Sequence, residues 1–111
     1  KLATTAFVAT AVGSLAYAYA TVSGGTVTLV KSSNITSITQ NSAGKFVVTM
    51  TNAASDTNYR IHVTGNYTAG GWLSAEDSST QARTTTKFGL AFFNFSFTPT
   101  DPSTFSLTVF A

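Results

Sequence analysis

The chain contains no cysteine, so neither a disulfide bond nor a thiolate metal site is available to it. Charged residues make up only 9% of the sequence, against roughly 25% in an average soluble domain. No apolar run approaches the ~20 residues that span a bilayer, so we expect no membrane insertion. A length of 111 residues fits one domain. Without disulfides, an extracellular domain of this size needs another source of stability, such as oligomerisation.

Cations are few and scattered. The pI of about 9.2 accompanies a net charge of only +2, because the chain has few titratable groups of either sign. The cationic residues are Lys1, Lys31, Lys45, Arg60, Arg83 and Lys87. They form no cluster that could follow a phosphate backbone, so we expect no nucleic-acid partner.

Serine and threonine replace charge, at about 30% of the chain. Aromatic residues reach 13% and include nine Phe. Disordered chains have few aromatics and high net charge, so disorder is excluded. Threonine, valine, tyrosine and phenylalanine fit a pleated, half-buried surface. The composition therefore predicts an all-β fold.

The N-terminal segment has two competing interpretations. Lys1, the mostly apolar residues 2–12 and then Ala18-Tyr19-Ala20 resemble a signal peptide with its cleavage site. Threonines interrupt that apolar run and no initiator methionine precedes it, so we expect a fragment of a longer protein instead. Residues 2–15 also fit a short helix that ends near Gly13. Such a helix is marginal in water alone and is expected to pack against copies of itself.

Period-two alternation begins at Tyr17 and predicts a series of short antiparallel strands in a sandwich or barrel. It slips by one residue at Val30, and a turn is expected at residues 41–44, where Gly44 supplies the positive φ. The apolar residues that alternate with polar ones are Val27, Leu29, Ile35, Ile38, Phe46, Val48, Met50, Tyr59, Ile61, Val63, Phe105, Leu107, Val109 and Ala111. The final strand follows a turn at residues 99–102.

Residues 66–80 differ from the strands around them. Tyr67, Trp72, Glu76 and Asp77 stand there among small residues, and we interpret the stretch as a long loop or as two short arms with a loop. Loops of this length in compact domains often carry function. Residues 80–87 are expected to form a polar edge strand.

Residues 88–97 are the most informative run. Phe88, Leu90 and Phe92 would point to one face of a strand, and Phe93, Phe95 and Phe97 to the other after a bulge. A strand with two apolar faces needs a second cover, since an exposed apolar strand aggregates. An identical chain is the simplest cover. The alternative is a bulge that keeps all six residues in one core.

The sequence offers few residues in patterns typical of an active site. Glycosidases need two carboxylates across a cleft, but Glu76 and Asp77 are adjacent and would face opposite ways on a strand. Asp56 fits a turn, and His62 lies on an outward face without an acid or nucleophile beside it. No nucleophile elbow, phosphate loop or metal-ligand spacing is present, so we expect neither an enzyme nor a cofactor or metal.

Several segments resemble bacteriophage tail-fibre proteins. Residues 1–8 (KLATTAFV) are similar to a segment that recurs in them, and residues 20–27 (ATVSGGTV) to the start of a fibre-tip domain. Further similarity covers residues 34–41 (NITSITQN), 44–48 (GKFVV), 56–59 (DTNY) and 105–111 (FSLTVFA). Gln40 stands where the family usually has an acid, and Ser42 where it usually has glycine. Residues 64–102 share no motif with the family.

The resemblance implies the C-terminal tip domain of a tail fibre, located at the distal end of the virion and attached to an upstream fibre shaft. It implies a homotrimer of antiparallel β-sandwiches (residues 17–111), intertwined or packed together and preceded by a short N-terminal helix (residues 1–16). The candidate trimer-interface residues are Phe7, Val8, Val12, Leu15, Phe93, Phe95 and Phe97.

Two functions stay open for such a domain. In the first, it binds a glycan or lipopolysaccharide of the bacterial surface, with aromatic rings stacking on sugars and amides and carboxylates bonding hydroxyls. The candidate ligand-binding residues are Asn66, Tyr67, Trp72, Glu76 and Asp77. In the second, it is a purely structural trimerisation or connector module of the tail. A lone carbohydrate-binding module of a secreted enzyme is a third, minor option.

Overall fold

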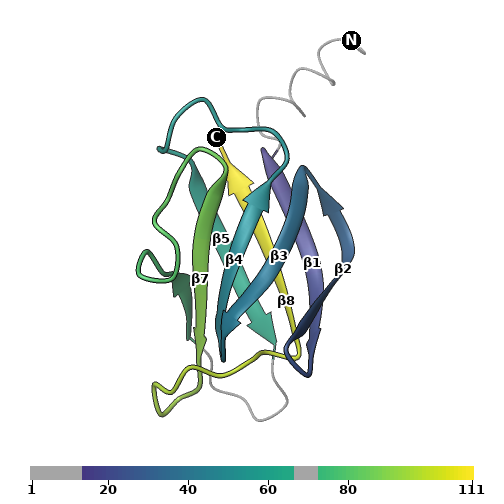
Figure 1. Ribbon diagram of the computed structural model, residues 1–111, viewed down its shortest axis with the longest axis vertical. Helices are drawn as coiled ribbons and strands as arrows, with labels where there is room; N and C mark the ends of the chain where they lie inside the picture. The colour runs from purple at the N-terminus through teal and green to yellow at the C-terminus, as the bar shows by residue number, and fades with distance from the viewer. Residues whose placement is uncertain (1–13, 67–72) are drawn as a thin grey trace, which may run out of the picture.

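A computed structural model describes residues 14–66 and 73–111, which form two antiparallel four-stranded sheets packed face to face (Figure 1). The predicted all-β sandwich is confirmed, and no helix occurs within these residues. The strands are β1 (Ala16–Ser23), β2 (Thr26–Ser33), β3 (Ile35–Ser42), β4 (Lys45–Met50), β5 (Arg60–Asn66), β6 (Leu73–Glu76), β7 (Lys87–Phe93) and β8 (Thr104–Phe110).

The two sheets divide the strands equally. Sheet A has the order β2-β1-β8-β5, and sheet B has the order β3-β4-β7-β6. The chain passes from sheet A to sheet B between β2 and β3 at Asn34, whose φ is 59°. The Asn34 side chain holds this crossing, since its Nδ2 donates to Leu15 O at 3.2 Å and its Oδ1 accepts from Asn52 N at 2.7 Å.

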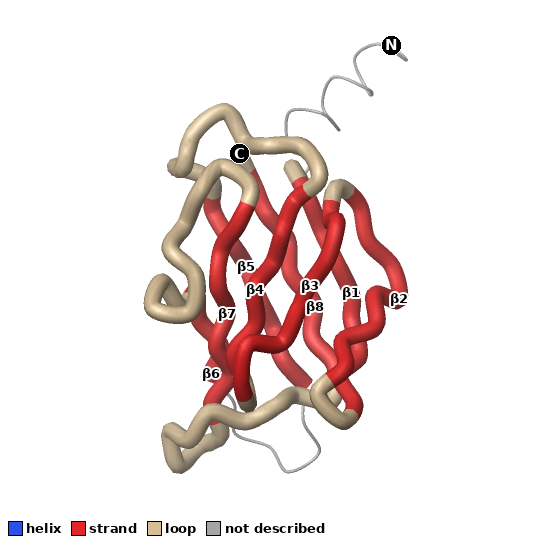
Figure 2. Tube along the Cα trace, viewed as in Figure 1, coloured by secondary structure: helices blue, strands red, loops and turns tan. Residues whose placement is uncertain are grey.

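β1 starts and β8 ends at the same end of the sandwich, because Ala16 is paired with Val109 (Figure 2). The opposite end carries the β1–β2 and β3–β4 turns and the segment 94–103, which connects sheet B to sheet A. We call this opposite end the loop end.

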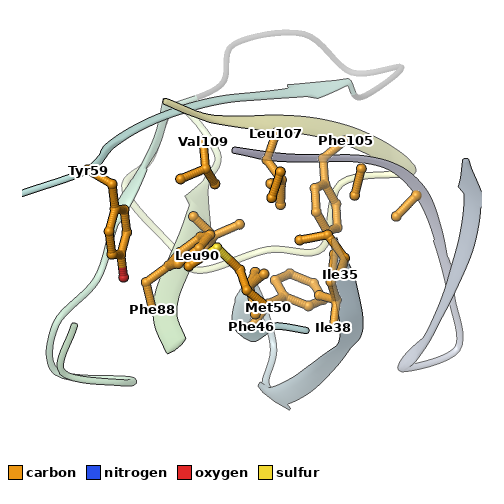
Figure 3. Close-up of a cluster of buried hydrophobic side chains, with 14 of the residues drawn as sticks. Ile35, Ile38, Phe46, Met50, Tyr59, Phe88, Leu90, Phe105, Leu107 and Val109 are labelled. Carbon is orange, nitrogen blue, oxygen red and sulfur yellow. The ribbon is translucent and has the colours of Figure 1, made fainter. Parts of the chain in front are cut away.

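The core lies between the sheets and follows the predicted alternation (Figure 3). Phe46, Val48 and Met50 of β4 are buried against sheet A, as are Phe105, Leu107 and Val109 of β8 against sheet B. Near the loop end, the ring of Phe92 lies 5.6 Å from that of Phe46 and 5.0 Å from that of Phe105. Each such buried side chain contributes about 1.5–3 kcal/mol through apolar area removed from water.

The predicted slip at Val30 is confirmed. Tyr19 is paired with Lys31 whereas Ala20 is paired with Leu29, so Val30 is an extra residue in β2. Val30 is 58% exposed. Because Val30 is an extra residue, the inward–outward alternation of β2 shifts by one position. Lys31 therefore lies on the outer face of sheet A, beside Tyr19.

The predicted edge strand at residues 80–87 is wrong. These residues form a turn and an irregular segment before β7 begins at Lys87. Thr84 Oγ1 accepts hydrogen bonds from the backbone nitrogens of Thr86 (3.2 Å) and Lys87 (2.9 Å). Threonine side chains that bond their own backbone in this way compete with strand pairing. The alternative interpretation of residues 66–80 as two short arms fits better, since β5 ends at Asn66 and β6 begins at Leu73.

The predicted single strand over residues 88–97 is also wrong. Phe88, Leu90 and Phe92 do face the core, but β7 ends at Phe93. Its second face carries Gly89 and Ala91, both buried within the same chain. Asp77 N donates to Gly89 O at 2.8 Å, and a Cβ on Gly89 would collide with Asp77 O. The second cover of β7 is therefore its own preceding loop, and an identical chain is not needed for that role.

The predicted helix falls almost entirely on residues 1–13, which lie outside the described residues, and it stays a prediction. The homotrimer likewise stays a prediction. Within residues 14–66 and 73–111, no helix has the length and apolarity needed to cross a membrane.

Candidate binding surfaces

The predicted ligand-binding residues do not form one cluster. Tyr67 and Trp72 lie outside the described residues. Asn66 is exposed at the loop end, where its carbonyl accepts from Ser103 N at 3.0 Å and from Ser103 Oγ at 2.9 Å. Glu76 is beside the start of β5, in a groove shared with Ile61. Ile61 and Asn66 are five positions apart along β5, a distance of roughly 16 Å.

Glu76 is bound by an arginine of its own chain. Its Oε2 accepts from Arg83 Nε at 2.9 Å and its Oε1 from Arg83 Nη2 at 2.5 Å, which is a bidentate pair. Arg83 Nη1 donates to the carbonyls of Thr57, at 2.8 Å, and Tyr59. This network ties the 51–59 loop to β6, so it stabilises the fold.

Tyr59 completes that network. The guanidinium carbon of Arg83 lies 4.4 Å from the centre of the Tyr59 ring, and Tyr59 OH donates to Thr84 O at 2.5 Å. Burial raises the pKa of Tyr59 above its ordinary value. The hydrogen bonds to Glu76 raise the pKa of Arg83 further. Neither group is poised to transfer a proton near neutral pH.

Asp77 is held just as firmly. Its carboxylate accepts from Ser79 Oγ at 2.6 Å and Thr80 Oγ1 at 2.7 Å, and it pairs with Lys45 Nζ at 3.0 Å. Hydrogen bonds from Ser79 and Thr80, helped by Lys45, lower the pKa of Asp77 well below its ordinary range. Its role is to fix the turn that covers Gly89. We call Lys45, Glu76, Asp77 and Arg83 the ion-paired side.

A shallow groove of about 320 Å³ separates the edge strands β5 and β6. It is lined by Ile61, His62, Val63, Thr64, Ser74, Ala75 and Glu76, and Ser74 Oγ donates to Val63 O across it at 3.3 Å. Glu76 is the one carboxylate among these lining residues, and Arg83 binds it. In residues 14–66 and 73–111, no three His, Cys, Asp or Glu side chains gather as metal ligands.

Asp101 organises the loop end. Its Oδ1 accepts from Gln40 Nε2 at 2.5 Å and from Gly44 N at 2.7 Å, which joins the 94–103 segment to the β3–β4 turn. The predicted positive φ of Gly44 is confirmed at 72°. A Cβ there would come within 2.5 Å of Thr100 N, so the close approach of the two segments requires glycine.

A second turn at the loop end displays two phenylalanines. Asn94 Oδ1 accepts from the backbone nitrogens of Ser96 (2.9 Å) and Thr98 (3.1 Å). Phe95 and Phe97 project from this turn, and each is 74% exposed. Phe97 has a φ of 59°, which is strained for a bulky side chain. Phe93, the third candidate interface residue of this run, is half-buried, with Lys45 Nζ 5.9 Å from its ring centre.

Sequence reasoning missed the aromatic residues on the outer face of sheet A. Tyr17 and Tyr19 of β1 are exposed there, 36% and 43% respectively. The signal was present in the alternation Ala16-Tyr17-Ala18-Tyr19-Ala20, whose alanines are buried. The alanines are the buried residues of this alternation, so the tyrosines between them point outward.

No protein-family model and no curated protein matches the chain. Among solved structures, the fold is similar to part of the phiAB6 tailspike, whose structure is in complex with three-repeated oligosaccharides of Acinetobacter baumannii surface polysaccharide. The TM-score is 0.50 at 19% sequence identity. The match covers 67% of this chain and 16% of the tailspike chain, so the chain corresponds to a small part of that protein. At this identity the likeness shows the fold alone.

Proposed function

We propose that this chain is the distal domain of a bacteriophage tail fibre and that it attaches the virion to a glycan or lipopolysaccharide on the bacterial surface. The observation that carries the proposal is the agreement of two independent likenesses. The sequence resembles tail-fibre tips in residues 1–63 and 103–111, and the sandwich resembles part of a tailspike that is seen with bacterial oligosaccharides. A hydroxyl-rich, weakly charged surface suits a virion part that must not adhere nonspecifically.

The proposed attachment is binding without cleavage. Three of the four Asp and Glu side chains are bound by another side chain of the same protein, namely Glu76 by Arg83, Asp77 by Lys45, and Asp101 by Gln40. A carboxylate fixed in this way is poorly suited to act as the acid or base of glycoside hydrolysis.

We propose a homotrimer as the working form, with the seven candidate interface residues as its contacts. Phe95 and Phe97 support this, because two phenylalanines exposed on one rigid turn are a typical contact surface. Leu15 lies at the opposite end, where its N donates to Val109 O at 2.6 Å. Leu15 at one end and Phe95 and Phe97 at the other would therefore join the subunits at both ends of the sandwich. Threefold display would raise weak single-site affinity through avidity.

Labelled protein applied to a panel of bacterial strains tests the proposal. We expect light scattering to give three times the 11.6 kDa chain mass. We expect binding to some strains, and loss of binding in isogenic mutants that lack the surface polysaccharide. Polysaccharide recovered after incubation should keep its length.

Three results would contradict the proposal in different ways. A stable monomer refutes the trimer, and shortened polysaccharide refutes binding without cleavage. If the trimer binds no strain and virions without this domain adsorb normally, the domain is a structural connector instead.

A further inference from the structure

The strand register brings residues from all of sheet A together on its outer face. Tyr17 is opposite Thr108 of β8, which is in turn opposite His62 of β5. One step along, Tyr19 lies between Lys31 of β2 and Ser106 of β8. They come from four strands, of which β5 and β8 are far from β1 in sequence, and the register places them side by side. We call Tyr17, Tyr19, Lys31, His62, Ser106 and Thr108 the tyrosine face.

The sheet fixes the backbone positions of three aromatic residues of this face. The Cα atoms of Tyr17 and Tyr19, alternate residues of one strand, are about 7 Å apart, and that of His62, two strands from Tyr17, is about 10 Å away. His62 packs edge-on against Phe110, with ring centroids 5.3 Å apart. β1 is paired on both sides, by β2 and β8, so the backbone that carries its tyrosines is anchored within the sheet. A pre-ordered backbone lowers the entropic cost of binding a partner.

Charge on this side of the molecule has one sign. Lys31 and Arg60 lie on the two edge strands of sheet A, and both are exposed. The four carboxylates of the chain are elsewhere: Asp56 is in the 51–59 loop, Asp101 at the loop end, and Glu76 and Asp77 on the ion-paired side. Among the described residues, Lys31 and Arg60 form no ion pair, whereas Lys45 and Arg83 do.

We infer that the tyrosine face binds an anionic polysaccharide, one whose sugars carry carboxylate or phosphate groups. The inference rests on the proposed function and adds the surface and the chemical class of the receptor. Tyrosine rings stack on the apolar faces of sugar rings, and their hydroxyls remain free to hydrogen-bond. Ser106 and Thr108 supply hydroxyls between the rings. Lys31 and Arg60, on the two edge strands, attract the negative groups of the polysaccharide from both sides of the face.

The composition of the face favours a sugar over a second copy of this protein. Protein–protein interfaces are depleted in serine and lysine at their core, yet Lys31 and Ser106 flank Tyr19 directly. Two copies meeting through this face would also bring Lys31 and Arg60 of each toward cations of the other, with no carboxylate between them. Like charges at close range oppose such an association.

The first experiment uses an array of purified bacterial surface polysaccharides, of which half carry uronic acids or phosphates and half are neutral. We expect the wild-type protein to bind members of the anionic half. Raising the salt concentration from about 50 mM to about 500 mM should weaken that binding, because exposed charges are screened. Binding restricted to neutral polysaccharides, or unaffected by salt, would overturn the inference.

The second experiment changes the face itself. Tyr17→Thr combined with Tyr19→Thr keeps strand-forming residues but removes both rings, and should weaken binding about tenfold or more. Tyr17→Phe with Tyr19→Phe is the matched control, which keeps the rings and most of the affinity. Lys31→Gln with Arg60→Gln should weaken binding to anionic polysaccharides and flatten its salt dependence. Circular dichroism establishes that each variant is folded.

The outcomes separate this inference from the proposed function. If the wild type binds and both the threonine and glutamine variants bind equally well, the receptor occupies another surface; attachment stands and this inference falls. If the threonine variant changes the mass in solution, the face is a subunit interface and the inference also falls. If the wild type binds no polysaccharide on the array and no bacterial strain, both proposals fail.

Discussion

The ion-paired side and the tyrosine face carry the same kinds of cation but use them differently. Lys45 and Arg83 are each bound by a carboxylate and lie close to an aromatic ring. Lys31 and Arg60 are exposed on sheet A, where the described residues offer them no ion pair. The paired cations of the ion-paired side therefore hold loops of the fold in place, in addition to the hydrophobic core between the sheets. Lys87 of β7 is also exposed without an ion pair among the described residues, but sheet A is where two such cations lie beside exposed tyrosines, and that surface is the one we infer to bind a partner.

Arg83→Gln is the change that should break the ion-paired side most strongly. It removes the bidentate pair with Glu76 and leaves the carbonyls of Thr57 and Tyr59 without their donor. We expect a loss of about 2 kcal/mol in the free energy of unfolding, measured by urea denaturation. Lys87→Gln is the matched control, an exposed cation that should cost under about 0.5 kcal/mol. Equal losses in both variants would refute this role for Arg83.

Asp77 gives the ion-paired side a dependence on pH. Its pKa is depressed in the folded protein, so its contribution is complete above the unfolded pKa of about 4 and is lost as the pH falls further. We expect Tm to drop as the pH falls below about 4. Asp77→Asn should lower the free energy of unfolding by about 1–2 kcal/mol at pH 7. Its Tm should also fall less steeply than that of the wild type as the pH is lowered, which is a shallower acid limb of the Tm profile. An acid limb identical to that of the wild type would contradict the assignment.

The smallest effect is expected on the tyrosine face. Lys31→Gln with Arg60→Gln removes two exposed cations that have no carboxylate partner among the described residues, so the free energy of unfolding should change by under about 0.5 kcal/mol. Urea denaturation alongside Arg83→Gln makes the contrast direct. A loss as large as that of Arg83→Gln would mean that these cations are structural, and the distinction between the two regions would disappear.

Much of the fold could be predicted because alternation reports which face of a strand is buried. Phe46, Val48 and Met50 were placed correctly in this way, and so was the slip at Val30. The predicted strand over residues 88–97 was wrong because a short polar side chain forms hydrogen bonds to the backbone and starts a turn there. Asn94 caps a turn that ends β7, although phenylalanines continue the apolar pattern beyond it. Hydrophobic periodicity alone does not register such a competing hydrogen bond.

The candidate site was harder to predict than the fold. Asn66 and Glu76 are close in sequence, but Asn66 ends β5 whereas Glu76 ends β6 and shares a groove with Ile61 at the start of β5. Tyr19, Lys31 and Ser106 are distant in sequence and adjacent in the sheet. Their proximity depends on the order of the strands and on one bulge, and neither can be derived from local composition.

The central position of β1 has a mechanical consequence. A pull applied at Ser14 enters the sandwich through a strand that is hydrogen-bonded along its length to β2 on one side and to β8 on the other. Antiparallel ladder bonds run perpendicular to the strand. Force directed along β1 therefore loads both ladders in shear, all rungs together, whereas an edge strand pulled sideways would unzip one rung at a time. Mechanical unfolding by a pull at this end therefore requires both ladders to rupture together.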